Sequence, residues 1–219
     1  QHEAVRPEDH VADAEPVEPS SLCDPGEFDD LTGRHPRRDL GFEGERRHGS
    51  QFGPNVPHMK LERGQVAVVT GAASGIGFAL SEAFAKAGVN VVLADVEQGA
   101  LTVAESKIKA HGVETLSVPT DVRKVESVEA LLAASVARFG RVHVVCNNAG
   151  YGLSGEFESL SENQIRTQME VNFFGLLNVT REALKVMREK NSPPGGRIQQ
   201  ITSVGGQRGV PTFSIYCAS

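Results

Sequence analysis

From residue 65 onward, short apolar runs alternate with longer segments in which apolar residues recur every three or four positions. A short apolar run suits a strand that is buried on both faces, and the longer segments suit amphipathic helices. Repeated strand–helix units predict an α/β fold with a doubly wound parallel sheet and helices on both of its faces. The expected strands are residues 66–69, 89–94, 115–118, 142–146 and 197–202.

The first expected helix follows a cluster of glycines and ends before Gly88, a residue type that favours helix C-termini. A later segment, residues 161–164, reads Ser-Glu-Asn-Gln, which is a capping box. We therefore expect a long helical region from there to residue 190. In the first helix, apolar residues at helical spacing predict one buried face, formed by Ile76, Leu80, Phe84 and Ala87.

Residues 1–58 lack this periodicity. They contain 13 acidic residues against six arginines and no lysine, a net charge of −7, together with seven prolines. Such a segment cannot bury enough apolar surface to offset the entropy of ordering it. We expect a disordered leader or extension at 1–58 and a folding domain at 59–219. Because the sequence begins with glutamine, we expect a fragment of a longer protein.

The folding part is almost neutral, with 15 acidic and 16 basic residues in positions 59–219. Its charge gives no reason to expect nucleic acid or an acidic membrane surface as a partner. No apolar run approaches the ~18 residues of a membrane span. Cys23, Cys146 and Cys217 show no metal-ligand spacing, so neither a metal site nor a disulfide framework is expected. A cytoplasmic location is the resulting expectation.

Gly71, Gly75 and Gly77 lie where the first expected strand passes into the first helix. The pyrophosphate of a dinucleotide needs backbone N–H groups at a helix N-terminus that it can approach closely. A side chain at Gly75 would keep the phosphates away, and Gly71 permits a tight turn. The cluster predicts a dinucleotide site, with a glycine-rich turn that binds nothing as the alternative.

Asp95 closes the second expected strand, 20 residues after Gly75. An acid at this place in the fold binds both ribose hydroxyls of the adenosine and repels a 2′-phosphate. No basic residue follows closely, and Ser74 rather than a base precedes Gly75. These observations favour NAD over NADP as the cofactor. A role for Asp95 as a helix N-cap is an alternative that does not exclude ribose binding.

Two further segments complete the pattern. Asn147-Asn148-Ala149-Gly150 follows the fourth expected strand, and Ser203 precedes Tyr216 by thirteen residues. With the G-x-x-x-G-x-G spacing of the glycine cluster, they make the chain resemble the short-chain dehydrogenase/reductase family over residues 61–219. The resemblance implies a Rossmann-like fold and an NAD(P)-dependent oxidoreductase that acts on a small alcohol or ketone.

The resemblance also implies roles for individual residues. Tyr216 would be the acid/base at the alcohol or carbonyl oxygen, Ser203 would hydrogen-bond the same oxygen, and Asn172 would hold a water in a proton relay. The residues implied in cofactor binding are Gly71, Ser74, Gly75, Ile76, Gly77, Asp95, Asp121, Val122, Asn148, Ala149 and Gly150.

The sequence stops after Tyr216-Cys217-Ala218-Ser219, one residue before the lysine of the family's Tyr-x-x-x-Lys motif. A neighbouring ammonium favours the phenolate form of a tyrosine. From the resemblance we expect that C-terminal strands of the sheet are missing and that the chain as given has little activity. A non-catalytic dinucleotide-binding protein or fragment stays open as an alternative, whereas the glycine spacing disfavours a sugar-nucleotide epimerase. A homo-oligomer also stays open, through a helix face that carries Phe173, Leu177 and Leu184.

Overall fold

The computed structural model describes residues 60–219, which contain a five-stranded sheet of order β3-β2-β1-β4-β5. All neighbouring strands run parallel, which confirms the doubly wound, Rossmann-like fold. The leader expected at residues 1–58 lies outside the described residues. The strands are β1 (Val66–Thr70), β2 (Asn90–Asp95), β3 (Thr115–Pro119), β4 (Val144–Asn147) and β5 (Arg197–Gln200).

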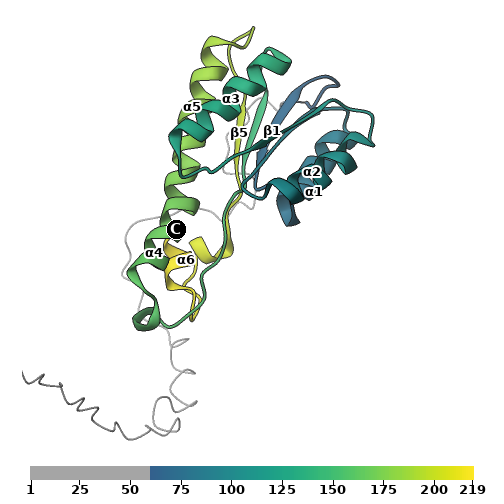
Figure 1. Ribbon diagram of the computed structural model, residues 1–219. Helices are drawn as coiled ribbons and strands as arrows, with labels where there is room; N and C mark the ends of the chain where they lie inside the picture. The colour runs from purple at the N-terminus through teal and green to yellow at the C-terminus, as the bar shows by residue number, and fades with distance from the viewer. Residues whose placement is uncertain (1–59) are drawn as a thin grey trace, which may run out of the picture. The chain divides into compact units, whose positions relative to one another are not determined.

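The α-helices of residues 60–219 are α1 (Gly75–Lys86), α2 (Gln98–Lys109), α3 (Val125–Phe139), α4 (Glu162–Met169), α5 (Leu176–Glu189) and α6 (Ser214–Ala218). Helices α1 and α2 cover one face of the sheet, and α3 and α5 cover the other (Figure 1). The side chains of β1 pack alternately into the hydrophobic cores on the two faces of the sheet. Ala67 and Val69 lie on the face covered by α1 and α2, and Val66 and Val68 lie on the face covered by α3 and α5. Within this part of the chain no helix has the length and apolar character needed to cross a bilayer.

The helical region expected at residues 161–190 contains an interruption. Its first turn forms as expected, because Ser161 and Gln164 make the reciprocal bonds of a capping box. Between α4 and α5, residues Glu170–Gly175 wind as a π-helix, a widened turn that is frequent at functional sites. Gly175 lets the π-helix pack closely against Val122, since a Cβ on Gly175 would lie only 2.6 Å from Cγ2 of Val122. The widened turn contains the predicted site residue Asn172.

The buried face of α1 differs from the prediction. Ile76 is 64% exposed and Ala87 is also exposed. At the start of α1 the residue nearest the sheet is Gly77, whose missing side chain lets the helix approach the end of β1 closely. A Cβ on Gly77 would overlap the carbonyl oxygen of Gly71 and lie 2.6 Å from Nδ2 of Asn148. The residues of α1 that are buried are Gly77, Ser81, Phe84 and Ala85.

A histidine side chain joins the amino-terminal ends of β1 and β4. The backbone N–H of Val66 donates to Nδ1 of the partly buried His143 at 2.9 Å. Burial, and secondly the charge of Arg141, lower the pKa of His143 below its ordinary value of 6.5. Both nitrogens of an imidazolium are donors, so protonation of His143 removes this hydrogen bond.

We expect Gly77→Ala to destabilise the fold by roughly 1–3 kcal/mol, because its methyl group overlaps backbone rather than a flexible side chain. Gly99→Ala in α2 is the matched control. A Cβ on Gly99 meets no atom within 4 Å, and the same substitution is expected there to stabilise by roughly 0.4–1 kcal/mol. Urea unfolding of the parent and both variants measures the difference, and equal stability of the two variants would contradict the packing argument.

We expect stability to fall as the pH drops below 6.5, because the unfolded chain takes up a proton at His143 before the folded chain does. His143→Asn keeps an acceptor oxygen for Val66 and removes the titrating group, so part of this pH dependence should disappear. The urea midpoint measured from about pH 5 to about pH 8 tests this. His111→Asn, which removes an imidazole that contacts Glu82 instead, should leave the effect of His143 in place. Identical pH dependence in the parent and His143→Asn would show that His143 is not responsible.

Candidate functional site

A pocket of about 1410 Å³ opens at the carboxyl ends of the strands. In doubly wound sheets, ligands bind at this edge where the strand order reverses, which here is between β1 and β4. Of the predicted site residues, only Gly77 does not line the pocket. The structure brings together the other thirteen: Gly71, Ser74, Gly75, Ile76, Asp95, Asp121, Val122, Asn148, Ala149, Gly150, Asn172, Ser203 and Tyr216.

The turn between β1 and α1 leaves open space beside the start of the helix. Gly71 and Gly75 have φ values of +65° and +53°, in the left-handed region that favours glycine. A Cβ on Gly75 would meet no atom within 4 Å, so this side of the turn faces the pocket. A Cβ on Gly71 would lie 2.9 Å from Nδ2 of Asn148. Gly75 therefore leaves room for a ligand, whereas Gly71 makes room for the segment after β4.

Thr70 and Asn148 hold the ends of β1 and β4 together. The buried Thr70 hydroxyl accepts from the backbone N–H of Asn148 and of Ala149, each at 3.0 Å, and donates to the carbonyl of Cys146 at 3.3 Å. In return, Nδ2 of Asn148 donates to the carbonyl oxygens of Thr70 and Gly71 at 2.9 and 3.3 Å. Sequence analysis missed Thr70, although a threonine at the end of an apolar strand was a usable signal.

The carboxylate of Asp95 supports the glycine turn from the end of β2. Its Oδ2 accepts from the backbone N–H of Ala73 at 2.9 Å, and its Oδ1 accepts from that of Glu97 at 3.1 Å. The apolar side chains of Ile76 and Val96 line the neighbouring part of the pocket and are 64% and 60% exposed. The structure thus combines an acidic residue with two apolar surfaces at the open side of the turn.

The second acidic residue of the pocket, Asp121, is paired with a residue that sequence analysis did not identify. Nε and Nη2 of Arg123 donate to the two carboxylate oxygens of Asp121, both at 2.8 Å. These hydrogen bonds hold the pKa of Asp121 below its ordinary value of 3.8. Among the described residues that line the pocket, Arg123 is the one lysine or arginine, and its charge is balanced by Asp121.

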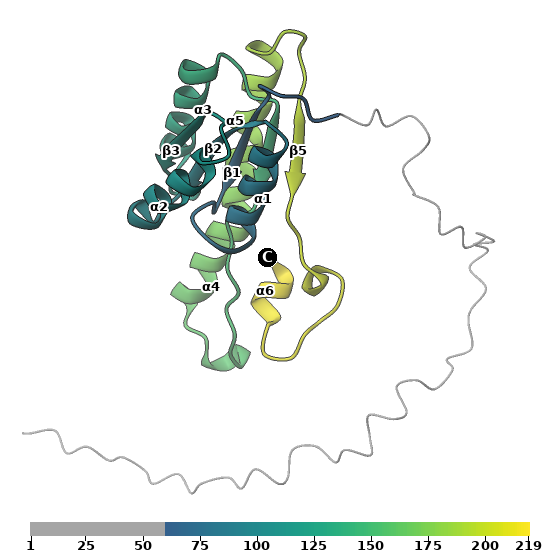
Figure 2. The same ribbon diagram turned by 90° about the vertical axis from the view of Figure 1, so that its right-hand side faces the viewer.

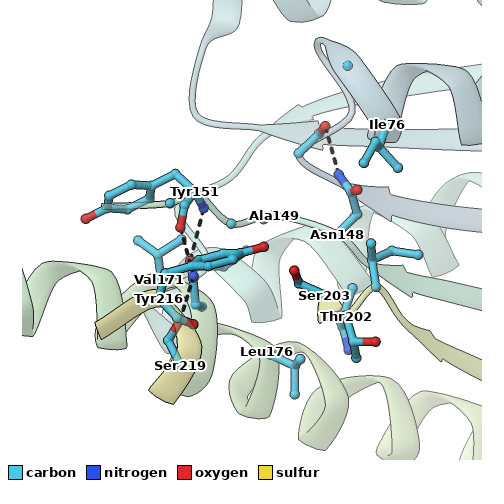
Figure 3. Close-up of a pocket in the computed structure, with 18 of the residues that line it drawn as sticks. Ile76, Asn148, Ala149, Tyr151, Val171, Leu176, Thr202, Ser203, Tyr216 and Ser219 are labelled. Carbon is cyan, nitrogen blue, oxygen red and sulfur yellow. Dashed lines mark hydrogen bonds between the residues drawn. The ribbon is translucent and has the colours of Figure 1, made fainter. Parts of the chain in front are cut away.

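Ser203, Tyr216 and Asn172 come from different elements and border the same pocket, and Figure 3 shows the first two of them. Ser203 follows β5, Tyr216 lies in α6, and Asn172 lies in the π-helix. The Ser203 hydroxyl oxygen accepts from the backbone N–H of Gly205 at 3.1 Å. In Figure 3 the Tyr216 hydroxyl points toward Ser203, whereas the Tyr151 hydroxyl points the opposite way. The structure therefore places the two hydroxyls predicted for catalysis on facing sides of one space.

Glycines border the ring of Tyr216 at both edges. A Cβ on Gly152 would lie 3.7 Å from Cδ2 of this ring, and a Cβ on Gly205 would lie 3.2 Å from Cε1. Phe213 contacts the ring edge-on, with centroids 5.9 Å apart. The ring is therefore held by three neighbours from two separate loops.

The two loops that carry these glycines also bond to each other. The backbone N–H of Gly155 donates to the carbonyl of Thr212 at 2.8 Å, and the hydroxyls of Ser154 and Thr212 are 3.3 Å apart. Thr212 has φ +65°, a conformation that β-branched residues rarely adopt. This residue directly precedes Phe213 and α6, so the contact between the loops fixes the start of the helix that carries Tyr216.

Both polar atoms of the Asn172 side chain hydrogen-bond to protein groups. Its Oδ1 accepts from the backbone N–H of Tyr151 at 3.1 Å, and its Nδ2 donates to the carbonyl of Tyr151 at 2.9 Å and to Oγ of Ser219 at 3.0 Å. Both amide hydrogens are used, so a water bound by this side chain would have to donate to Oδ1. Asn172 anchors the segment after β4 to the π-helix and to the end of α6.

The cysteine of β4 belongs to the core. Cys146 is buried, its Sγ lies 3.6 Å from Oε1 of Gln199, and burial raises the pKa of its thiol to about 11. Within residues 60–219, no three His, Cys, Asp or Glu side chains gather in a way that could hold a metal ion.

Comparisons with known proteins show which family the chain is similar to. The profile of the short chain dehydrogenase family matches residues 65–219. The chain is 42% identical over 152 residues to an uncharacterized oxidoreductase of Schizosaccharomyces pombe, a match that covers 69% of this chain and 49% of the relative. It is 33% identical over 161 residues to the ketoacyl reductase HetN of Nostoc sp., and this match covers 74% of this chain and 55% of that protein.

A solved structure is similar as well. The short chain dehydrogenase/reductase of Burkholderia phymatum in complex with NAD has a TM-score of 0.70 and 37% sequence identity, covering 73% of this chain and 56% of that chain. The chain spans about half the length of the curated relatives described above. The family profile spans the glycine turn, the segment after β4 and the Ser203–Tyr216 region. The chain therefore belongs to the short-chain dehydrogenase/reductase family.

Proposed function

We propose that this chain binds NAD(H) in preference to NADP(H) and transfers a hydride between that cofactor and a small alcohol or carbonyl compound, with Tyr216 as the acid/base. One observation carries the proposal: a single pocket is lined by the open side of the glycine turn and by both Ser203 and Tyr216. A protein that only binds a dinucleotide needs the turn but not the two hydroxyls. Family membership supports a dehydrogenase or reductase activity.

The described residues fit a nicotinamide dinucleotide. The open side of Gly75 leaves room for a pyrophosphate beside the N-terminus of α1, where backbone N–H groups are available. Asp95 would accept hydrogen bonds from the ribose hydroxyls, and Ile76 and Val96 offer apolar surfaces for a base. The bound cofactor supplies or accepts the hydride.

Ser203 and Tyr216 would act on the oxygen of the substrate. The oxygen of the Ser203 hydroxyl accepts from Gly205, which leaves its hydrogen available to donate to the substrate oxygen. That bond stabilises negative charge as it develops on the oxygen. Tyr216, pointing toward the same space, would exchange a proton with this oxygen. Asn172 would hold a relay water through Oδ1, because its amide hydrogens are already used.

We also propose that the 219-residue chain by itself turns over slowly. No lysine lines the pocket in the part of the chain that the structure describes, and Arg123 is paired with Asp121. Without a nearby unpaired cation, the phenolate form of a tyrosine lacks electrostatic support. In that case the chain binds cofactor but catalyses little, which is the behaviour of a dinucleotide-binding fragment.

The apolar helix face named above is exposed in this chain, with Phe173, Leu177 and Leu184 at 43%, 37% and 36% exposure. Exposed apolar residues on one helix face favour a protein contact. Pairing of two copies through this face remains a proposal.

The acid/base role is tested by appending one residue after Ser219, either lysine or methionine. A residue four positions after Tyr216 continues the same helical face, so a lysine there would place its ammonium beside the phenol. We expect the lysine form to oxidise secondary alcohols with NAD about tenfold faster or more near neutral pH, because the ammonium stabilises the phenolate. The assay follows NAD reduction from about pH 6 to about pH 10. Equal rates for the two forms across this range would show that the account of Tyr216 is wrong.

In the lysine form, Tyr216→Phe should lower the rate by about 10²–10⁴-fold, the usual contribution of a positioned acid or base. Tyr151→Phe is the matched control, because it removes a hydroxyl that points away from Ser203. Binding of NADH, measured by its fluorescence, should be unchanged in both variants. If both lose activity to the same extent, the effect belongs to the loop and not to the Tyr216 hydroxyl.

The cofactor preference is tested at Asp95. Replacing it with alanine would also remove the acceptor for Ala73, so Asp95→Asn, which keeps one acceptor oxygen, is the cleaner change. We expect the parent to bind NAD at least about tenfold more tightly than NADP, and Asp95→Asn with Val96→Arg to reverse that order. Glu97→Gln is the control, since it removes a neighbouring charge that does not line the pocket. Tighter binding of NADP by the parent would show that Asp95 has been assigned wrongly.

A further inference from the structure

Gln168 lies in α4, one helical turn before Asn172, and its side chain is completely buried. A buried amide is stable only when its polar atoms find partners. Its Oε1 accepts from the backbone N–H of Leu153 at 2.7 Å, and its Nε2 donates to Oγ of Ser219 at 3.3 Å. The side chain thus connects the loop after β4 with the end of α6.

The hydroxyl of Ser219 is the point where these contacts meet. It accepts from Nε2 of Gln168 and from Nδ2 of Asn172, and it donates to the carbonyl of Tyr216 at 2.9 Å. A hydroxyl accepts two hydrogen bonds and donates one, so this group has no capacity left. The carbonyl oxygens of both amides are occupied by backbone N–H groups of the 151–153 segment. These partners determine which way each amide is oriented.

The network joins parts of the chain that are far apart in sequence. Gln168 lies 15 residues from Leu153 and 51 residues from Ser219. Figures 1 and 2 both show α6 beside α4 at the end of the sheet where the pocket opens. Figure 3 shows Ser219 next to Tyr216 at that place, with Tyr151 on the neighbouring segment.

We propose that Gln168 is a positioning residue that, together with Asn172, holds α6 and the 151–153 segment at a fixed separation and so determines where the Tyr216 hydroxyl lies. The proposal rests on the proposed function of Tyr216 as acid/base. Gln168 does not itself line the pocket, so it acts through Leu153 and Ser219. Small displacements of a catalytic group have large effects on rate, which gives the network its functional value.

A packing role and a hydrogen-bonding role can be separated at this residue. Gln168→Met fills a similar volume but has neither a carbonyl acceptor nor an N–H donor. Gln168→Glu keeps an acceptor oxygen for Leu153 but cannot donate to Ser219 while ionised. Gln98→Met, on the exposed start of α2, is the matched control for the first substitution.

The test uses the 219-residue chain labelled with fluorotyrosine, because the sequence has only two tyrosines. Fluorine NMR then gives one resonance for Tyr151 and one for Tyr216, assigned with the Tyr151→Phe variant. Hydrogen exchange reports the backbone amide of Leu153. In Gln168→Met we expect that amide to exchange about tenfold faster or more, since its buried acceptor is lost, and the Tyr216 resonance to shift or broaden. In Gln168→Glu we expect protection of Leu153 to persist while the Tyr216 resonance still changes.

Two results would overturn the proposal. One is a Tyr216 resonance that matches that of the parent in folded Gln168→Met. If Gln168→Met does not fold, the same result in folded Gln168→Glu would overturn the proposal. The other is a rise in the exchange rate of the Val68 amide, in β1, that equals the rise at Leu153. Gln168 would then support the whole fold rather than this site. NADH binding by the parent is measured separately by fluorescence. Failure of that binding would count against the proposed function, while the exchange and fluorine data would still decide the role of Gln168.

Discussion

The Thr70 hydroxyl makes three hydrogen bonds at the point where the strand order of the sheet reverses, and the geometry of the pocket depends on them. β1 occupies the centre of the sheet, with β2 on one side and β4 on the other. By accepting from the backbone N–H groups of Asn148 and Ala149, Thr70 fixes the distance between the glycine turn and the segment after β4. Asn148 then reaches back to the turn through its side chain. The two walls of the pocket are thus set by the same buried bonds.

The acidic residues of the pocket are held in place by donors from the protein. Asp95 is bound by two backbone N–H groups, of Ala73 and Glu97, and Asp121 is bound by the guanidinium of Arg123. Polar groups that are oriented before a ligand arrives need little rearrangement on binding. The opposite region, around Ser203, has hydroxyls in place of charges. Charged side chains and hydroxyl groups are therefore separated along the pocket.

The sequence predicted the parallel sheet because strands buried on both faces are continuous apolar runs, as in β1, where every residue is buried. It also predicted thirteen of the residues that line the pocket, because the glycine turn, Asp95 and the segment after β4 each follow a strand and parallel strands end at one edge. It did not predict Gln168, whose partners lie far away in the chain. The exposure of Ile76 was missed as well, since hydrophobic periodicity takes no account of the close packing at Gly77. The chemical roles of the lining residues stay predictions until the variants are assayed.

The bonded loops beside Tyr216 have a consequence for protein engineering. The 151–155 loop and the 204–213 loop meet at Gly155 and Thr212, and a glycine from each borders the same aromatic ring. A loop grafted alone from a relative would bring new side chains against an unchanged opposite loop, and it would have to keep the backbone geometry that joins Gly155 to Thr212. The two loops therefore form one structural unit, and reshaping the wall of the pocket around Tyr216 requires transplanting both together.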